Sequence, residues 1–92
     1  IYAQMAYSFN TIAELGPLVR YHRKRAGLSR ANLAEVSGVG QTVIYELEHG
    51  KETVQFDVIR KLFDVLNLQM QVDGPLVKAY QDETEGQNEQ EG

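Results

Sequence analysis

Three polar side chains near the middle of the chain have types and a spacing that could do chemistry. In residues 38–51, GVGQTVIYELEHGK, the side chains of Gln41, Thr42 and Tyr45 fall within about 100° of one another on a helical wheel. Ile44 and Leu47 fall on the opposite arc and are expected to face a core. A glutamine amide can bind adenine through two hydrogen bonds, and threonine can offer a hydroxyl to a base or a methyl group to thymine. The spacing is therefore compatible with recognition of nucleic acid bases.

The distribution of charge permits a polyanionic partner, although the net charge is −4. Residues 82–92 (DETEGQNEQEG) hold five acids and no base, and the rest of the chain holds nine bases and eight acids. Because charge acts locally, the basic segment matters more than the total. Five of the nine bases lie within eleven residues: Arg20, Arg23, Lys24, Arg25 and Arg30.

The sequence offers little for catalysis or metal binding. There is no cysteine, which excludes disulfides and thiolate sites. His22, expected to be packed, and His49, expected to be exposed, each lack a second ligand at a useful spacing, and no nucleophile–base pair stands out. No apolar run approaches membrane-spanning length and no leader is visible, although the chain begins with Ile and Met5 is a candidate natural start. We therefore expect a cytoplasmic protein that is not an enzyme and needs no cofactor, metal or membrane.

The elements that must position these residues are helices in one small domain. Thr11 and Glu14 fit a capping box, and Ser29 is a good N-cap. Gly27 and Gly50 are expected to end helices. The predicted segments are a helical turn near 11–15, a helix at about 17–26, and helices at about 30–37, 41–49 and 56–66.

Two of the predicted helices, at 30–37 and 41–49, are joined by few residues with Gly38 at the bend, which is a helix-turn-helix arrangement. In such units the N-terminal part of the second helix enters the major groove of DNA. Here that part carries Gln41 and Thr42. A short helix pair with a polar outer face also occurs in domains that bind nothing, so the pattern alone leaves both interpretations open.

The chain has Arg23 four residues before Gly27, followed by Leu28-Ser29, Leu33-Ala34, Gly38-Val39, Ile44 and Leu47-Glu48-x-Gly50. With these features, residues 18–51 resemble the Cro/CI-type helix-turn-helix family of small bacterial and phage repressors, and the resemblance extends over most of 15–67. The helix predicted at 56–66, running into an alternating segment at 68–72, is similar to HipB-type antitoxins.

The resemblance implies an all-α, lambda-repressor-like helix-turn-helix domain of four to five helices with a short C-terminal dimerising β-strand. HipB-type proteins dimerise, repress their own operon and bind a HipA-type serine/threonine kinase toxin. The expected partners are therefore double-stranded operator DNA, a second copy of the chain and a HipA-type kinase, in the bacterial cytoplasm and at the nucleoid when DNA is bound. The alternatives are a stand-alone phage-type repressor, or a protein-interaction module that has lost DNA binding.

The chain departs from the family pattern at three positions. Arg30 stands where the family usually has a glutamine that touches phosphate, and a helix N-terminus itself favours anions. Asn32 replaces a capping glutamate, and Gly40 replaces the usual Ser or Thr cap of the reading helix. We expect Arg30 to contact the DNA backbone, together with Lys51 and Thr53 in the loop after that helix.

Arg23 and Glu48 match a family pair that links the first helix to the third. The resemblance therefore predicts a partly buried, structural ion pair between them. Arg20, Lys24 and Arg25 are either a solvated helix surface or contacts to phosphate or toxin.

Residues 68–72 alternate apolar and polar side chains, which is strand spacing. Because a lone strand is not stable, the segment needs a partner. It could pair with its counterpart in a second copy, burying Leu68, Met70 and Val72, or with the N-terminal residues of its own chain; the resemblance favours the dimer. The predicted organisation is an N-terminal extension at 1–10, a DNA-binding domain at 11–67, a dimerisation strand at 68–72 and an acidic, disordered tail at 73–92.

Overall fold

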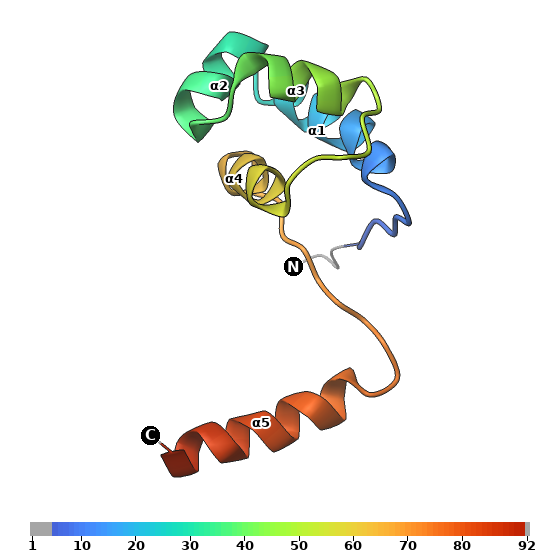
Figure 1. The fold of residues 1–92 in the computed structure, drawn as a ribbon, viewed down its shortest axis with the longest axis vertical. Coiled ribbons are helices and arrows are strands. Elements are labelled where there is room, and N and C mark those ends of the chain that lie inside the picture. The colour runs from blue at the N-terminus through green and yellow to red at the C-terminus, as the bar shows by residue number, and fades with distance from the viewer. Residues whose placement is uncertain (1–4, 92) are drawn as a thin grey trace.

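A computed structural model describes the backbone of residues 5–91 and the side chains of residues 5–85 (Figure 1). Residues 1–4, which belong to the predicted N-terminal extension, lie outside the described part. The all-α class is confirmed for the residues described. The elements are a 3-10 helix, η1 (Ile12–Glu14), followed by α1 (Leu15–Arg25), α2 (Arg30–Ser37), α3 (Gln41–Glu48), α4 (Phe56–Leu66) and α5 (Val77–Glu91).

Local hydrogen bonds explain where the first helices begin and end. The Glu14 carboxylate accepts hydrogen bonds from the backbone N–H groups of Asn10 and Thr11, each at 2.9 Å, and these bonds hold the pKa of Glu14 below its ordinary value. Ser29 Oγ accepts from the Asn32 N–H at 3.0 Å and caps α2. The turn between α2 and α3 uses a left-handed residue, Gly38, with φ of 76°.

The core lies where α1 to α4 meet, and Figure 1 shows α4 packed beneath the other three helices. Its fully buried side chains include Leu15, Leu33 and Ile59. The backbones of α1 and α3 approach so closely that a Cβ added to Gly16 would lie 2.2 Å from the Leu47 carbonyl oxygen. Close packing at this crossing fixes the position of α3 relative to α1.

The segment at 68–72 forms no strand in the single chain, so the strand expected to pair with a second copy stays a prediction. Leu68 packs partly against the core, but Met70 is 37% exposed and Val72 is 85% exposed. The physical reason is that one strand has no ladder partner within the described chain.

The C-terminal segment is helical, whereas its composition predicted disorder. Val77–Glu91 contains no proline and is rich in residues with good helix propensity. Lys78 and Asp82 pair at 3.3 Å, one helical turn apart. Figure 1 shows α5 standing away from the four packed helices at the end of an extended connection. Among the described residues, no helix combines the length and apolar character that crossing a membrane would require.

Candidate nucleic-acid interface

Helix α3 buries one face and presents the other to solvent, as its helical wheel predicted. Ile44 and Leu47 are fully buried, whereas Gln41 and Thr42 are exposed and Tyr45 is 50% exposed. Gly40 is the N-cap and offers no side chain, so the first turn relies on backbone hydrogen bonds such as Ile44 N–H to Gly40 O at 3.1 Å. The polar residues therefore stand outward on a helix that the core holds in place.

The carboxylate of Glu48 joins three helices. Arg23 of α1 donates from Nε to Oε2 at 2.6 Å and from Nη2 to Oε1 at 3.0 Å. Arg30 of α2 donates from Nε to the same Oε1 at 3.0 Å. Arg23 also donates from Nη1 to the Leu28 carbonyl at 2.9 Å. The structure thus brings together the two residues that the family resemblance paired, and adds Arg30 to them.

Two opposing effects set the protonation of Glu48. Burial of its side chain, which has no exposed surface, would raise the pKa. The hydrogen bonds and positive charges of Arg23 and Arg30 outweigh that effect and hold the pKa of Glu48 below its ordinary value. Glu48 therefore remains a carboxylate near neutral pH and keeps both guanidinium groups bound.

Tyr45 is held by neighbours on two helices. Its ring stacks on that of His49, with centroids 3.9 Å apart and planes inclined by 23°. The guanidinium carbon of Arg30 lies 5.1 Å from the Tyr45 ring centroid, within the range of a cation–π interaction. These contacts restrict the direction in which the phenol points. Sequence reasoning missed them, although the spacing of four residues between Tyr45 and His49 could have signalled the stack.

The predicted backbone contacts differ in their surroundings. The side chain of Arg30 is 28% exposed, and its Nε is bound to Glu48. Lys51 Nζ pairs with Glu46 Oε1 at 3.2 Å, and both side chains are well exposed. Thr53 is exposed in the loop that follows α3. A surface pair such as Lys51–Glu46 is weak and leaves the lysine able to exchange partners.

Residues 14–73 match the protein family described as a helix-turn-helix domain. This chain belongs to that helix-turn-helix family. A curated relative, the uncharacterized HTH-type transcriptional regulator y4mF of Sinorhizobium fredii, is 37% identical over 71 residues, which cover 77% of this chain and 93% of the relative.

Solved structures share the fold of this helix-turn-helix protein. The HipB-O4 20mer complex matches with a TM-score of 0.67 and 19% identity, over 75% of this chain and 97% of that chain. The HipA-HipB-O2-O3 complex matches with a TM-score of 0.68 and 19% identity, over the same shares. At this identity the likeness concerns the fold.

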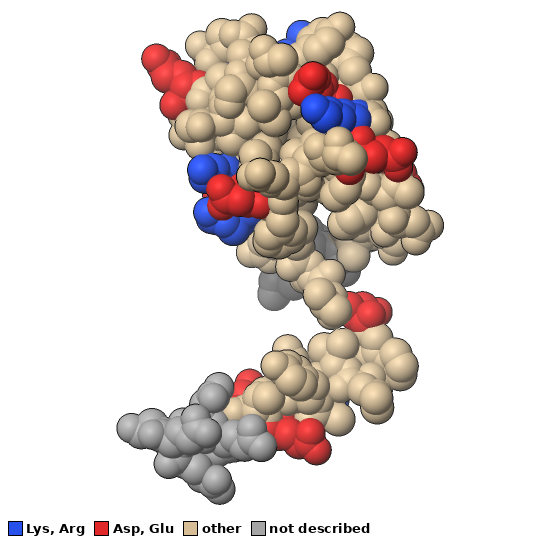
Figure 2. Space-filling model, in the orientation of Figure 1, with Lys and Arg blue, Asp and Glu red and all other residues tan. Residues whose placement is uncertain are grey.

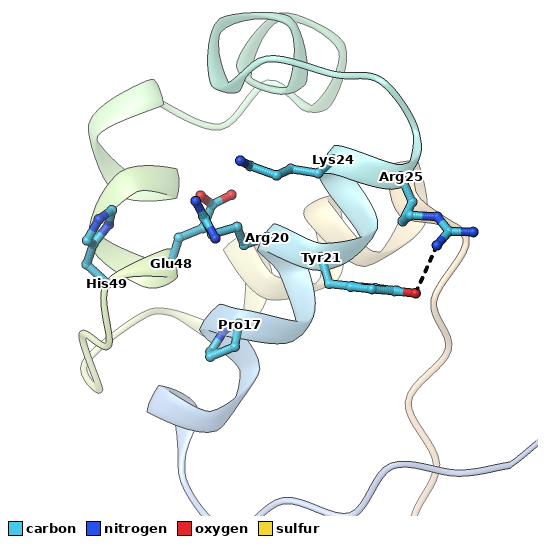
Figure 3. Close-up of a pocket in the computed structure, with 7 residues that line it drawn as sticks. All are labelled: Pro17, Arg20, Tyr21, Lys24, Arg25, Glu48 and His49. Carbon is cyan, nitrogen blue, oxygen red and sulfur yellow. Dashed lines mark hydrogen bonds between the residues drawn. The ribbon is translucent and has the colours of Figure 1, made fainter.

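A basic hollow lies beside the helix-turn-helix unit, between α1 and the end of α3 (Figure 3). We call it the α1 hollow. Arg25 is held against Tyr21, with Nη1 3.3 Å from the phenol oxygen and the guanidinium carbon 5.6 Å from the ring centroid. Among the side chains described, Arg20 and Lys24 take part in no ion pair. The charged side chains that line the hollow are Arg20, Lys24, Arg25 and Glu48, and His49 lines it as well.

The two histidines of this helix-turn-helix protein have local partners. His22 Nδ1 lies 2.8 Å from the Leu18 carbonyl oxygen and is partly buried. His49 Nδ1 lies 2.7 Å from the Tyr45 carbonyl oxygen and is exposed. In the part of the chain that the structure describes, no group of three or more His, Cys, Asp or Glu side chains is arranged to hold a metal ion.

Proposed function

We propose that this protein is a sequence-specific DNA-binding autorepressor of transcription, acting in the bacterial cytoplasm and at the nucleoid when bound to DNA. One observation carries the proposal: α3 is locked by its buried face and by Glu48, and presents Gln41, Thr42 and Tyr45 outward from its N-terminal part. A helix held in this way can enter a major groove without rearranging. Membership of the helix-turn-helix family and the similarity to a transcriptional regulator support the same function.

Each residue of the proposed interface has a chemical role. Gln41 would pair with adenine N6 and N7, and Thr42 would contact a base edge or a thymine methyl group. The oriented phenol of Tyr45 would reach a base one turn along α3. Arg30, whose side chain is partly exposed, would hold phosphate, as would Lys51 and Thr53.

Binding to the DNA upstream of the gene tests this proposal. Fluorescence anisotropy should show tighter binding to that DNA than to a scrambled duplex of equal length. Gln41→Ala and Thr42→Ala should each lose about 1–3 kcal/mol of discrimination at one base position. Asp64→Ala, an exposed change on α4, is the control and should leave binding unchanged. Equal affinity of the wild type for both duplexes would favour an interaction module that has lost DNA binding.

We further infer that two copies pair through residues 68–72 as an antiparallel two-stranded sheet. The exposure of Met70 and Val72 supports this, because pairing would bury apolar side chains that the single chain leaves in water. The double variant Met70→Lys, Val72→Lys should sediment as a monomer. The matched variant Gln69→Lys, Gln71→Lys places the same charges on the alternate face and should remain a dimer. A dimer in the first variant would contradict strand pairing.

The proposed protein partner is a HipA-type serine/threonine kinase toxin, for which this chain would be the antitoxin. The supporting observation is the shared fold with HipB in the HipA-HipB-O2-O3 complex. The gene beside this one should encode a kinase-like protein, and the two products should co-purify. Absence of a kinase-like neighbour would favour a stand-alone phage-type repressor.

A further inference from the structure

The α1 hollow concentrates positive charge that the packing of the fold does not use. Arg20 and Lys24 are exposed and, among the described side chains, take part in no ion pair, and Arg25 donates a hydrogen bond to the Tyr21 hydroxyl and lies over its ring. The one carboxylate that lines the hollow belongs to Glu48 and already accepts hydrogen bonds from Arg23 and Arg30. The hollow therefore carries an excess of positive charge, and among the described side chains Arg20, Lys24 and Arg25 pair with no carboxylate.

This concentration of charge contrasts with basic residues elsewhere. On α4, Arg60 pairs with Asp57 and Asp64 at 3.1 Å, and Lys61 pairs with Asp57 at 3.2 Å. These bonds hold the pKa of Asp57 below its ordinary value. The face drawn in Figure 2 shows the same pattern, with most Lys and Arg side chains lying beside Asp or Glu and no extended basic patch. Cations that are already paired in this way gain little binding free energy from a further anion.

The hollow is continuous with the proposed reading face. His49 lines the hollow on one side and stacks on Tyr45 on the other, with ring centroids 3.9 Å apart. Figure 3 shows Arg20 and Lys24 extending from α1 toward the side of α3 that carries Glu48 and His49. A DNA strand that borders the groove occupied by α3 would therefore bring its phosphates toward this end of the helix.

We propose that the α1 hollow binds the phosphate backbone of DNA and extends the interface beyond the helix-turn-helix unit, with Arg20 and Lys24 as its phosphate ligands. This inference rests on the proposed DNA-binding function. Cations without partners give up no internal ion pair when they bind phosphate, and they release counterions from the DNA. Because phosphates carry no sequence information directly, the hollow would add affinity to every duplex equally.

The salt dependence of DNA binding tests the proposal with the full-length chain. The double variant Arg20→Gln, Lys24→Gln should lower the slope of log K against log salt concentration by about 0.9 for each phosphate that is no longer neutralised. In a two-fold dimer both copies carry the substitutions, so the change in slope is doubled. The control Arg60→Gln, Lys61→Gln removes the same charge from α4 and should leave the slope near that of the wild type. Thermal unfolding should show that both variants remain folded, since these side chains lie at the surface.

Three outcomes are decisive. A smaller slope in the Arg20, Lys24 variant alone, with an unchanged ratio of affinities for upstream and scrambled DNA, supports the proposal. Equal slopes in the two double variants overturn it. The result is separable from the proposed reading function, because discrimination between duplexes tests α3 whereas the slope on scrambled DNA tests the hollow.

The third outcome concerns the acidic end of the chain, a competing occupant. The variant Asp82→Asn, Glu83→Gln, Glu85→Gln neutralises acids of α5. If it binds DNA more tightly than the wild type, and this gain disappears when Arg20 and Lys24 are also replaced, the tail occupies the hollow. That result would overturn DNA phosphate as its resident ligand. If the change in DNA affinity is equal with and without the replacement of Arg20 and Lys24, the tail does not occupy the hollow, in agreement with the proposal.

Discussion

Replacing Glu48 by alanine should destabilise the fold far more than an ordinary change of surface charge. The substitution leaves Arg23 without two of its three hydrogen bonds, in a site where the residue is only 5% exposed. Water cannot easily take the place of the missing carboxylate there. An uncompensated buried charge of this kind costs about 3–5 kcal/mol.

Arg30 should add little to this loss of stability. It also loses a hydrogen bond, but its side chain is 28% exposed and can regain water. A chain of 92 residues has a total stability of about 5–14 kcal/mol. Glu48→Ala should therefore remove a large fraction of it.

Urea denaturation followed by circular dichroism measures the effect. Glu46→Ala is the matched control, because Glu46 pairs with Lys51 at the surface and should lose less than about 1 kcal/mol. Glu48→Leu combined with Arg23→Met should recover much of the loss, since Arg30 is partly exposed and no fully buried charge is left unpaired. If the free energy of unfolding of Glu48→Ala lay within about 0.5 kcal/mol of the wild-type value, Arg23 would have to be hydrated in the fold and could not form a stabilising buried pair with Glu48.

Substitutions at Glu48, Gly16 and Gly40 should also change the stability of the fold or its dependence on pH. The pKa of Glu48 is lowered in the folded state, so its stabilisation is complete above its ordinary pKa of 4.5 and is lost as pH falls through the folded value. Acid unfolding should therefore depend less on pH in Glu48→Gln. Gly16→Ala should lower the free energy of unfolding by at least about 1–3 kcal/mol, because its Cβ would lie 2.2 Å from the Leu47 carbonyl oxygen. Thermal melts measure this loss. In the same melts Gly74→Ala should be tolerated, because its Cβ approaches nothing nearer than 3.7 Å. Gly40→Ser should raise the melting temperature slightly, because it supplies α3 with the capping side chain that it lacks; an unchanged or lower value would contradict this view of the cap.

The parts of the fold that could be predicted from sequence are those set by local chemistry. The bounds of α2 follow from the Ser29 cap and from Gly38, which takes the left-handed conformation that ends the helix. The inward direction of Ile44 and Leu47 follows from helical geometry alone. The partner of Glu48 did not follow in this way, because Arg23 is 25 residues distant and only the family resemblance suggested it.

The remaining features depend on packing or on another chain. Arg30 looked like a free phosphate ligand in the sequence, but the approach of α2 to α3 places it on Glu48 and near Tyr45. Helix α5 was missed because high charge and a lack of large apolar side chains resemble disorder, although the same residues have good helix propensity. A strand at 68–72 needs a second chain, so neither the sequence nor a single chain determines its structure.

Above all, we propose that the outer face of α3 reads bases. The most direct measurement is the ratio of affinities for the upstream DNA and a scrambled duplex, compared between the wild type and the variant Gln41→Ala, Thr42→Ala, Tyr45→Ala at one fixed salt concentration. We expect a large ratio for the wild type, a ratio near one for the variant, and little change in affinity for the scrambled duplex, because the phosphate contacts remain. A variant that kept the wild-type ratio would contradict the claim.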